Sequence, residues 1–485
     1  MKSKRPLFVL LIAFALSIGL RWQGLGSEHE GMHFWLDSHV LTTSQIWEEE
    51  GFFTYRGNLI LSFPAEGNEF VPIPTFTDLF DEQGKLYYVS YPPLGLWMPH
   101  AAHQLLGLKM SLLSLRTWSL LLHFLTILIL YHSLRVYGFA ERLSLWLVLL
   151  YLFAPGPMYY QANIYFSEML AQLWWLLCLW GFGYGRRRDF DRRQFWFWLL
   201  LSFVFVLTEW LSVLALGSLG LLWLWQKRGF KRLLPLVLGG SLALALTLWQ
   251  YSQIAGLEVL WEHWTNRYAY RSGARITILA FLEEVVLKHP HRMYALLPGL
   301  SLLGLIFLRG RGKLAPWPAF LTLALIPYAA HALVFRNFSY LHDFSALKSG
   351  PFWILLSAYL LQSASAYWQR LSVLRSSIFT GALLLLWISF GTQRYYLYAH
   401  ASSPEPALGY QIAEKVPEGV PVFMDQLPSL PTMWVAQRNV GQGDSLSVQR
   451  WLEKHGRWEA ILCHIEHDSV ANITWVRRPN PQDDP

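Results

Sequence analysis

The chain has 485 residues, of which 54% are hydrophobic, 15% are charged and 25 are tryptophan. Soluble domains carry about a quarter charged residues, so this composition and the many long apolar runs indicate an integral membrane protein. The net charge of +7 does not indicate nucleic-acid binding, because the basic residues cluster in short loops between apolar runs.

Runs with almost no charged residues recur along the chain and predict an all-α polytopic membrane protein with about eleven spans. The first run predicts an uncleaved signal anchor, because the polar residues at 21–23 interrupt the approach to a cleavage site. The runs on either side of Glu209 form either one broken helix or a tight hairpin. The predicted spans are 6–20, 117–134, 143–167, 169–185, 195–208, 210–226, 233–257, 293–308, 314–335, 349–369 and 376–393.

The charges of the loops predict how the chain is oriented in the membrane. With the N-terminus in the cytoplasm, five basic loops face the cytoplasm, whereas the loop at 23–91 holds eleven acids and only Arg56 and Lys85. An odd number of spans then places the C-terminus outside. The predicted cytoplasmic loops are 135–142, 186–194, 227–232, 309–313 and 370–375.

Two large outer loops are expected within a membrane domain that covers residues 1–393. The first, 23–116, contains an apolar segment, Pro93–Leu108, that predicts an interfacial helix. The second, 251–292, contains Arg267, Arg271 and other basic residues on the outer side, where the positive-inside rule does not expect them. This exception suggests that the second loop binds an anion.

The remainder, 394–485, predicts a small extracytoplasmic α/β domain. Four short strand-like runs surround a polar helix near 444–454. The strand-like runs are Val420–Met424, Met433–Val440, Ala460–Ile465 and Ile473–Val476.

The carboxylate of Asp37 is the first candidate for chemistry. It lies just after the first span, in segment 33–39 with the sequence HFWLDSH. An acid in such a setting can act as a general base or bind a metal, and His39 beside it is a candidate for substrate binding. The alternative is a solvated loop acid without a function.

Two further carboxylates lie near the outer ends of predicted spans. Glu168 opens the span at 169–185, where an ionisable group is costly unless it is used or paired. The alternative for Glu168 is an acid favoured by the positive end of the helix dipole. Glu209 either lines the same cavity as a substrate-binding residue or is a buried, paired structural acid.

Two outer segments carry other polar candidates. Tyr91 precedes the paired prolines at 92–93, which stiffen a turn and can shape a pocket wall. The segment 336–343 contains Arg336, suited to bidentate phosphate binding, and His342, which can donate to an oxyanion. Anchoring at the membrane interface is the alternative for this segment. Its other candidates for substrate binding are Tyr340 and Asp343.

In this order and loop placement, the motifs resemble the GT-C superfamily of polytopic glycosyltransferases. That superfamily includes the protein O-mannosyltransferases and the bacterial enzymes that transfer aminoarabinose to lipid A. The resemblance covers about residues 5–393. Two positions that hold lysine in many relatives are occupied here by Tyr91 and Glu209. The second acid of the family is usually Asp, whereas this chain has Glu168. The matching motifs are HFWLD at 33–37, YPPLG at 91–95, Arg116, LRVYG at 134–138, Ala154-Pro155, Glu168, LTEW at 207–210 and the segment 340–343.

The resemblance implies an inverting glycosyltransferase that moves a sugar from a polyprenyl-phosphate donor to a hydroxyl acceptor at the outer face of the membrane. The acceptor is a lipid, a glycan or a protein. Asp37 then deprotonates or orients the acceptor hydroxyl, and basic residues, or a divalent metal held by Asp37 and Glu168, stabilise the departing phosphate. The implied location is a bacterial inner membrane, with dolichyl-linked donors of archaea or eukaryotes left open.

Three other functions stay open from the sequence: a transporter or flippase for a lipid-linked sugar, a non-catalytic membrane scaffold, and an oligosaccharide ligase or polymerase that uses the same donors. A transporter is disfavoured, because no inverted repeat is evident and only Glu209 places a charge deep within the spans. The expected partners are membrane lipids and the two substrates, without nucleic acid. Cys178 and Cys463 form neither a disulfide framework nor a zinc-binding spacing.

Overall fold

The computed structural model describes residues 5–25, 31–63, 78–186, 188–273, 276–312, 314, 316–364, 373–401 and 404–478. Packing divides the chain into two units, each made of segments that are far apart in sequence. The first unit comprises Met1–Gly26, Leu113–Thr247 and Tyr268–Ala399. The second unit comprises Ser27–Leu112, Leu248–Arg267 and His400–Pro485.

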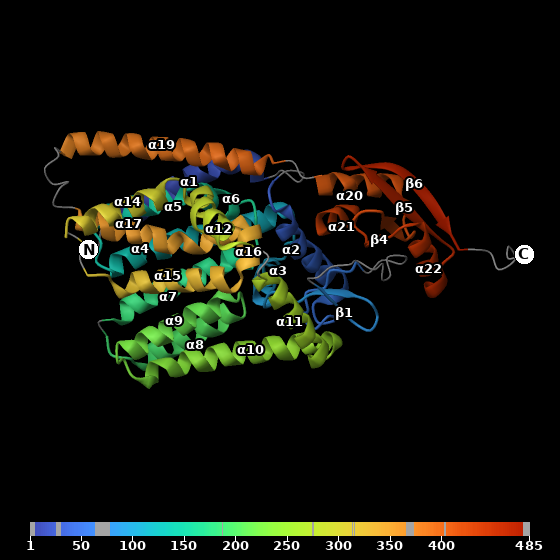
Figure 1. The fold of residues 1–485 in the computed structure, drawn as a ribbon, viewed down its shortest axis with the longest axis horizontal. Coiled ribbons are helices and arrows are strands. Elements are labelled where there is room, and N and C mark those ends of the chain that lie inside the picture. Colours follow the sequence, from blue (N-terminus) through green and yellow to red (C-terminus); the bar gives the residue numbers. More distant parts are fainter. Residues whose placement is uncertain are drawn as a thin grey trace, which may run out of the picture. The chain divides into compact units, whose positions relative to one another are not determined.

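The first unit is a bundle of helices, and each of the eleven predicted apolar runs contains a helix among its described residues (Figure 1). Residues 365–369 of the predicted run 349–369 lie outside the described residues. Its elements, including those that cross into the second unit, are α1 (Arg5–Leu25), α4 (Leu112–Val136), α5 (Glu141–Leu152), α6 (Pro155–Tyr160), α7 (Ser167–Gly185), α8 (Arg192–Val206), α9 (Leu211–Trp225), η2 (Phe230–Arg232), α10 (Leu233–Ala255), α12 (Ile278–Phe281), η3 (Leu282–Lys288), α13 (His289–Tyr294), α14 (Leu297–Gly310), α15 (Ala319–Val334), α16 (Arg336–Leu341), η4 (Asp343–Ser349), α17 (Gly350–Ser363) and α19 (Val373–Ala399).

Among the described residues, four helices are long and apolar enough to cross a membrane. A fifth is added if Ile278–Tyr294 and Leu297–Gly310, which meet at 113°, count as one broken span. Helices α9 and α15 are apolar but shorter. The chain is therefore a polytopic helical protein, and the number of eleven spans stays a prediction. The four long spans are Arg5–Leu25, Leu112–Val136, Phe230–Ala255 and Asp343–Ser363.

Two predicted spans have a different internal structure. The run 143–167 is interrupted, because α5 ends at Leu152 and Pro155 starts α6, where its missing N–H costs no helical hydrogen bond. The run around Glu209 forms two helices, α8 and α9, that pack against each other, so the hairpin alternative is correct. Helix α19 packs against α6, and a Cβ on Gly391 would clash with the Phe153 carbonyl oxygen.

The second unit combines the first outer loop, α11 and the C-terminal segment. The hairpin of β1 and β2 is antiparallel, and α3 confirms a helix within the predicted segment 93–108. The described elements are α2 (Phe34–Ile46), η1 (Trp47–Gly51), β1 (Asp78–Phe80), β2 (Leu86–Tyr88), α3 (Leu94–Leu105), α11 (Leu257–Ser272, which continues into the first unit), α20 (Pro404–Lys415), β3 (Val422–Met424), α21 (Leu430–Ala436), β4 (Val440–Gln442), α22 (Ser445–His455), β5 (Glu459–Glu466) and β6 (Ser469–Arg477).

The C-terminal segment forms the predicted α/β structure, with a four-stranded sheet in the order β4-β3-β5-β6. Strand β3 is parallel to β4 and β5, and β5 pairs with β6 in an antiparallel hairpin. A strand predicted over Met433–Val440 is wrong for its first half, which lies in helix α21. The Ser429 side chain caps that helix and Pro431 lies in its first turn, so these start signals outweigh the β-propensity of the apolar residues.

The C-terminal segment packs against the first outer loop. Phe34 of α2 contacts Trp434 of α21 edge to face, with ring centroids 5.7 Å apart. The Asn439 side chain accepts a hydrogen bond from the Phe63 backbone N–H at 2.9 Å and donates one to the Phe63 carbonyl at 3.2 Å. The Gly31 N–H donates to the Ala401 carbonyl at 2.9 Å. The structure therefore groups segment 400–485 with the first outer loop in one unit.

Candidate functional site

Asp37 lies in the first turn of α2 and is fully buried. The helix begins directly after His33, whose left-handed backbone turns the chain into it. The positive end of the helix dipole favours a carboxylate in this turn. The alternative of a solvated loop acid is therefore wrong, because the Asp37 side chain is 0% exposed. A buried carboxylate in a loop outside the long apolar helices is a candidate for chemistry.

His39 is held as a neutral acceptor. Its Nδ1 donates to the Trp35 carbonyl at 2.7 Å, which leaves Nε2 as the acceptor of the ring. Its ring contacts the Tyr88 ring edge to face, with centroids 4.5 Å apart. Burial, and to a smaller extent the positive charge of Arg267, lower the pKa of His39 to about 4, although the bond to Trp35 raises it. The imidazole is therefore uncharged at neutral pH.

The turn that contains Tyr91 is fixed by α10 and α11. The Tyr251 hydroxyl donates to the Tyr91 carbonyl at 2.6 Å, and the Trp264 indole N–H donates to the Val89 carbonyl at 2.9 Å. Tyr88 and Tyr91 stack with centroids 6.2 Å apart. Because His39 contacts Tyr88 and interacts electrostatically with Arg267, the second unit brings three predicted residues into one neighbourhood: His39, Tyr91 and Arg267. Asp37 lies two positions before His39 on α2, so the two side chains point to different sides of that helix.

The first unit holds the second predicted acid. Glu168 is buried in the first turn of α7, where the helix dipole favours it. One turn further along, the Gln172 amide donates to the Leu347 carbonyl at 3.0 Å and accepts from Gln161 at 2.6 Å. The start of α7 is therefore part of a buried polar region rather than a lipid-facing helix end.

Glu209 is the acid of a buried ion pair that the sequence left as one of two alternatives. The Lys348 ammonium donates to Glu209 Oε1 at 3.0 Å and to His331 Nε2 at 2.9 Å. The other carboxylate oxygen of Glu209 accepts from the Leu211 N–H at 2.6 Å and so caps the start of α9. Both side chains of the pair are nearly inaccessible, with 1% exposure for Glu209 and 3% for Lys348. The geometry agrees with the paired-acid alternative, and substrate binding by Glu209 stays a prediction.

The basic residues of the second outer loop are partly neutralised. Lys288 pairs with Glu283 at 2.8 Å and with Glu284 at 2.6 Å, and Arg292 lies 3.7 Å from Glu284. Arg271 is buried, with its guanidinium 5.1 Å from the centre of the Phe338 ring. Anion binding by Arg267 and Arg271, which lie one turn apart on α11, stays a prediction.

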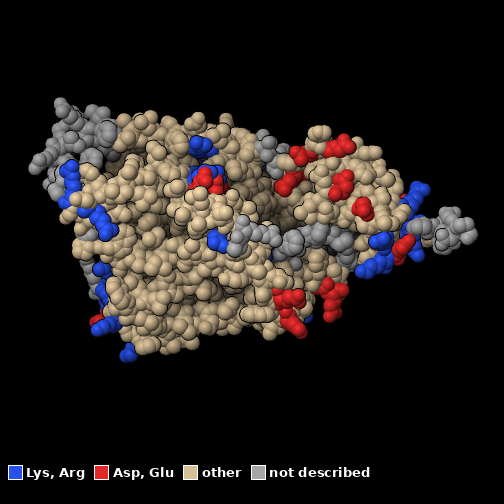
Figure 2. Space-filling view, in the orientation of Figure 1, with Lys and Arg blue, Asp and Glu red and all other residues tan. Residues whose placement is uncertain are grey.

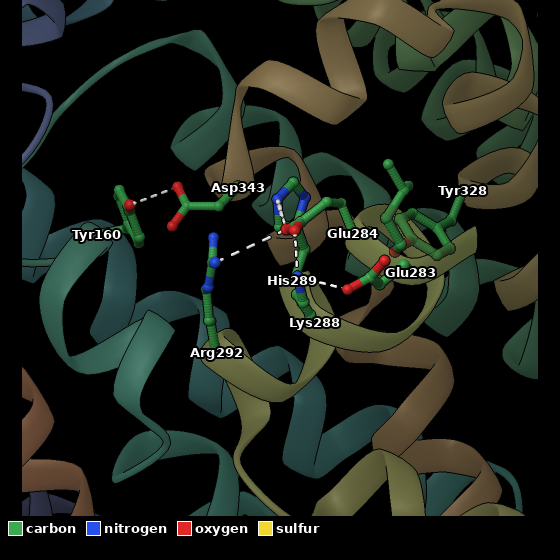
Figure 3. A network of polar contacts seen from close by, with 9 residues as sticks. Tyr160, Glu283, Glu284, Lys288, His289, Arg292, Tyr328 and Asp343 are labelled. Atoms are coloured by element: carbon green, nitrogen blue, oxygen red, sulfur yellow. Dashed lines mark hydrogen bonds and ion pairs between the residues drawn. The ribbon is translucent and has the colours of Figure 1, made fainter. Parts of the chain in front are cut away.

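The segment 336–343 contributes a second polar cluster, together with α6 and α13. Asp343 accepts a hydrogen bond from the Tyr160 hydroxyl at 2.9 Å. In Figure 3, Arg292 extends toward the space between Asp343 and Glu284, and His289 lies beside the Glu284 carboxylate, 3.7 Å from it.

Two other predicted residues of this segment, His342 and Tyr340, contact aromatic or apolar side chains. The His342 ring stacks on Phe344 with centroids 5.2 Å apart. Tyr340 packs against a small apolar cluster that includes Phe281 and Val285. Arg336 lies at the first position of α16.

The sequence reasoning missed Lys348, His331 and Tyr160. Lys348 directly precedes the predicted span 349–369, so its charge was interpreted as the end of an outer loop and not as a partner for Glu209. The only available signal was that an acid between two apolar runs requires a buried cation. Among the described residues, no three His, Cys, Asp or Glu side chains are grouped so that they could hold a metal ion. The two cysteines are buried and free.

Comparisons with known proteins add a fold assignment. No protein-family model and no curated protein matches the sequence. The structure superposes on ArnT from Cupriavidus metallidurans with a TM-score of 0.60 and 14% identity, over 95% of this chain and 93% of that one. It has the GT-C fold. The superposed glycosyltransferases therefore share an architecture with this polytopic membrane protein.

Two other solved structures agree with this fold. The Archaeoglobus fulgidus oligosaccharyltransferase in its apo form gives a TM-score of 0.59 at 13% identity, over 95% of this chain and 70% of that chain. The mycobacterial arabinofuranosyltransferase AftD gives 0.55 at 15% identity, over 95% of this chain but only 35% of its own length. At these identities the likeness concerns the fold.

Proposed function

We propose that the chain is an inverting glycosyltransferase that transfers a sugar from a polyprenyl-phosphate donor to a hydroxyl acceptor. The observation that carries the proposal is the GT-C fold over nearly the whole chain, combined with a buried carboxylate, Asp37, in the first outer loop. Structures of two of the similar proteins contain a lipid phosphate: ArnT has been solved with undecaprenyl phosphate and the archaeal oligosaccharyltransferase AglB with a dolichol-phosphate.

Asp37 serves as the base of the reaction. A phosphate is already a good leaving group, so the transfer needs one base and no strong general acid, unlike glycoside hydrolysis with its two carboxylates. The Asp37 carboxylate takes the proton of the acceptor hydroxyl, whose oxygen forms the new bond to the anomeric carbon as the bond to the phosphate oxygen breaks. Burial keeps bulk water from competing with the acceptor.

The departing phosphate carries negative charge, which requires cations near it. Arg267 on α11 is the proposed contributor, because it interacts electrostatically with His39 and belongs to the same unit as Asp37. Arg271, which the sequence also predicts for this role, follows on the same helix. Arg336 is a further candidate. The described residues do not form a three-ligand metal group, and no step is assigned to a metal.

The loop charges support a topology for this chemistry. The N-terminus is proposed to lie in the cytoplasm, and Asp37 and the C-terminal segment outside it, in a bacterial inner membrane. A transfer assay, and not the fold, identifies the sugar and the acceptor class (a lipid, a glycan or a protein).

The test is a transfer assay on purified protein with a panel of radiolabelled polyprenyl-phosphate sugars. We expect the wild type to release polyprenyl phosphate and Asp37→Asn to retain its fold but lose at least about a hundredfold in rate, the scale of a lost general base. The matched control is Glu82→Gln, which changes an exposed acid of the same loop in the same way and should retain full activity.

Full activity in Asp37→Asn contradicts the assigned base. Uptake of a lipid-linked sugar into proteoliposomes without any covalent product would instead support the transporter.

A further inference from the structure

The ends of α7, α8 and α9 surround a narrow surface depression in the first unit, called the hollow below, which is too small to enclose a water molecule. Its lining includes the guanidinium-bearing residues Arg186, Arg228 and Arg232, the rings of Trp198 and Trp223, and the Gln226 amide. The hollow lies where α7 ends at Gly185 and α9 ends at Trp225, which the sequence predicts to be the cytoplasmic ends of two membrane spans. The proposed reaction uses none of these residues.

The two loops beside the hollow carry an unusual share of the charge of the protein. Segments 186–193 and 227–232 contain nine basic and two acidic residues, so their net charge of +7 equals that of the whole chain. Figure 2 shows basic side chains gathered along the left edge of the view, where ends of the membrane helices lie. So concentrated a charge attracts an anion from the membrane surface.

Two arginines of the hollow donate hydrogen bonds to backbone carbonyls. Arg232 is buried and donates to the carbonyls of Gly185, at 3.5 Å, and Arg188, at 3.2 Å. Arg228 donates to the Arg186 carbonyl at 3.1 Å. A guanidinium has five N–H donors, so these bonds orient the groups and leave donors for a ligand.

Other groups around the hollow are consistent with an anion. Of the two nearby acids, Asp191 is occupied as the cap of α8, where it accepts from the Gln194 N–H at 2.8 Å. Asp189 interacts electrostatically with Arg232. Within the described chain, the side-chain oxygen of Gln226 is buried without a hydrogen-bond partner, and its amide can rotate to offer N–H donors.

Apolar side chains continue from this site along the outside of two helices. Trp196 and Leu200 of α8 are exposed, as are Leu221 and Trp225 of α9. In a bilayer these faces contact acyl chains. A ligand with a phosphate group and attached hydrocarbon chains therefore matches both the charged hollow and the apolar faces beside it.

We propose that the solvent-accessible arginines at the mouth of the hollow bind the headgroup of an anionic phospholipid, with its acyl chains along α8 and α9. Arg186 and Arg228 contact the phosphate, and Arg232 holds the shape of the site through its backbone bonds. The proposal rests on the membrane fold and is independent of the proposed glycosyl transfer.

The test titrates the purified full-length protein with phosphatidylglycerol or phosphatidylcholine in detergent and counts bound lipid by native mass spectrometry. We expect phosphatidylglycerol to bind more tightly than phosphatidylcholine. Each basic residue at a membrane surface contributes enough that Arg228→Gln should weaken phosphatidylglycerol binding about fivefold, and Arg186→Gln/Arg228→Gln about twentyfold or more.

The matched control is Arg309→Gln/Arg311→Gln, which removes two exposed charges from another predicted cytoplasmic loop and should change the affinity less than twofold. All variants leave Arg232 intact, so its two bonds to backbone carbonyls remain. Equal affinity for both lipids, or an unchanged affinity in Arg186→Gln/Arg228→Gln, overturns the proposal. Saturation by glycerol phosphate at the same concentration as phosphatidylglycerol would assign the site to a soluble phosphate instead.

Discussion

The buried pair of Glu209 and Lys348 provides a sharp test of how the helices of the first unit are held together. The pair joins the α8–α9 turn to η4, and His331 adds α15 to the same cluster. Removing one partner of a buried ion pair leaves the other charge uncompensated and costs about 3–5 kcal/mol. With 1% and 3% exposure and a 3.0 Å contact, both Glu209→Gln and Lys348→Met should fall in that range.

The double variant Glu209→Gln/Lys348→Met removes both charges, so it should be much less destabilised than the sum of the single variants. The free energy of unfolding can be measured in mixed micelles with increasing dodecyl sulfate, and the four proteins form a double-mutant cycle. Lys288→Met is the control, because it removes an exposed lysine that is also ion-paired and should leave the stability unchanged. Additive single effects, with no coupling in the cycle, would refute the reasoning.

Two further predictions follow from single side chains. The pKa of His39 is lowered to about 4, so below about pH 6.5 the unfolded chain takes up a proton that the folded protein does not. The free energy of unfolding should therefore fall by up to about 3 kcal/mol as the pH drops from 6.5 to 4. Unfolding measurements at pH 7 and pH 4.5 check this, and an equal pH dependence in His39→Gln contradicts it. Gly391→Ala should destabilise the protein by about 1–3 kcal/mol, because the added Cβ meets the Phe153 backbone. Gly381→Ala in the same helix is the control, because its Cβ enters open space and should be neutral or slightly stabilising. Equal thermal stability of the two variants would contradict the packing described for α19.

Periodic and local features of the sequence predicted most of the helical architecture. Long apolar runs have few alternatives in a membrane protein, and every predicted run contains a helix, although the run 143–167 is divided between α5 and α6. The strand assigned to Met433–Ala436 failed because a short apolar run has no clear period, and the cap at Ser429 decided its conformation.

The candidate site was only partly accessible from sequence. Asp37 was proposed from its position after the first span, but its burial depends on packing that no local pattern encodes. The pairing of Glu209 with Lys348 joins residues 139 positions apart, and nothing in either local sequence identifies the partner. The side chains of Tyr251 and Trp264 donate the hydrogen bonds that fix the turn at Tyr91. No local pattern in the sequence connects these two aromatic residues with that turn.

The contact between α2 and the C-terminal segment has a consequence for how this protein can change over evolution. Trp434 and Asn439 belong to a segment that looks like an appendage in the sequence, yet Trp434 contacts Phe34, the first residue of the helix that carries Asp37, and Asn439 binds the backbone of Phe63 later in the same outer loop. If the C-terminal segment were replaced by that of a relative, Phe34 of α2 and Phe63 would lose the contacts that Trp434 and Asn439 make with them. The first outer loop and the C-terminal segment form one packed unit although they are far apart in the sequence. A substitution in one contact surface therefore requires a fitting substitution in the other.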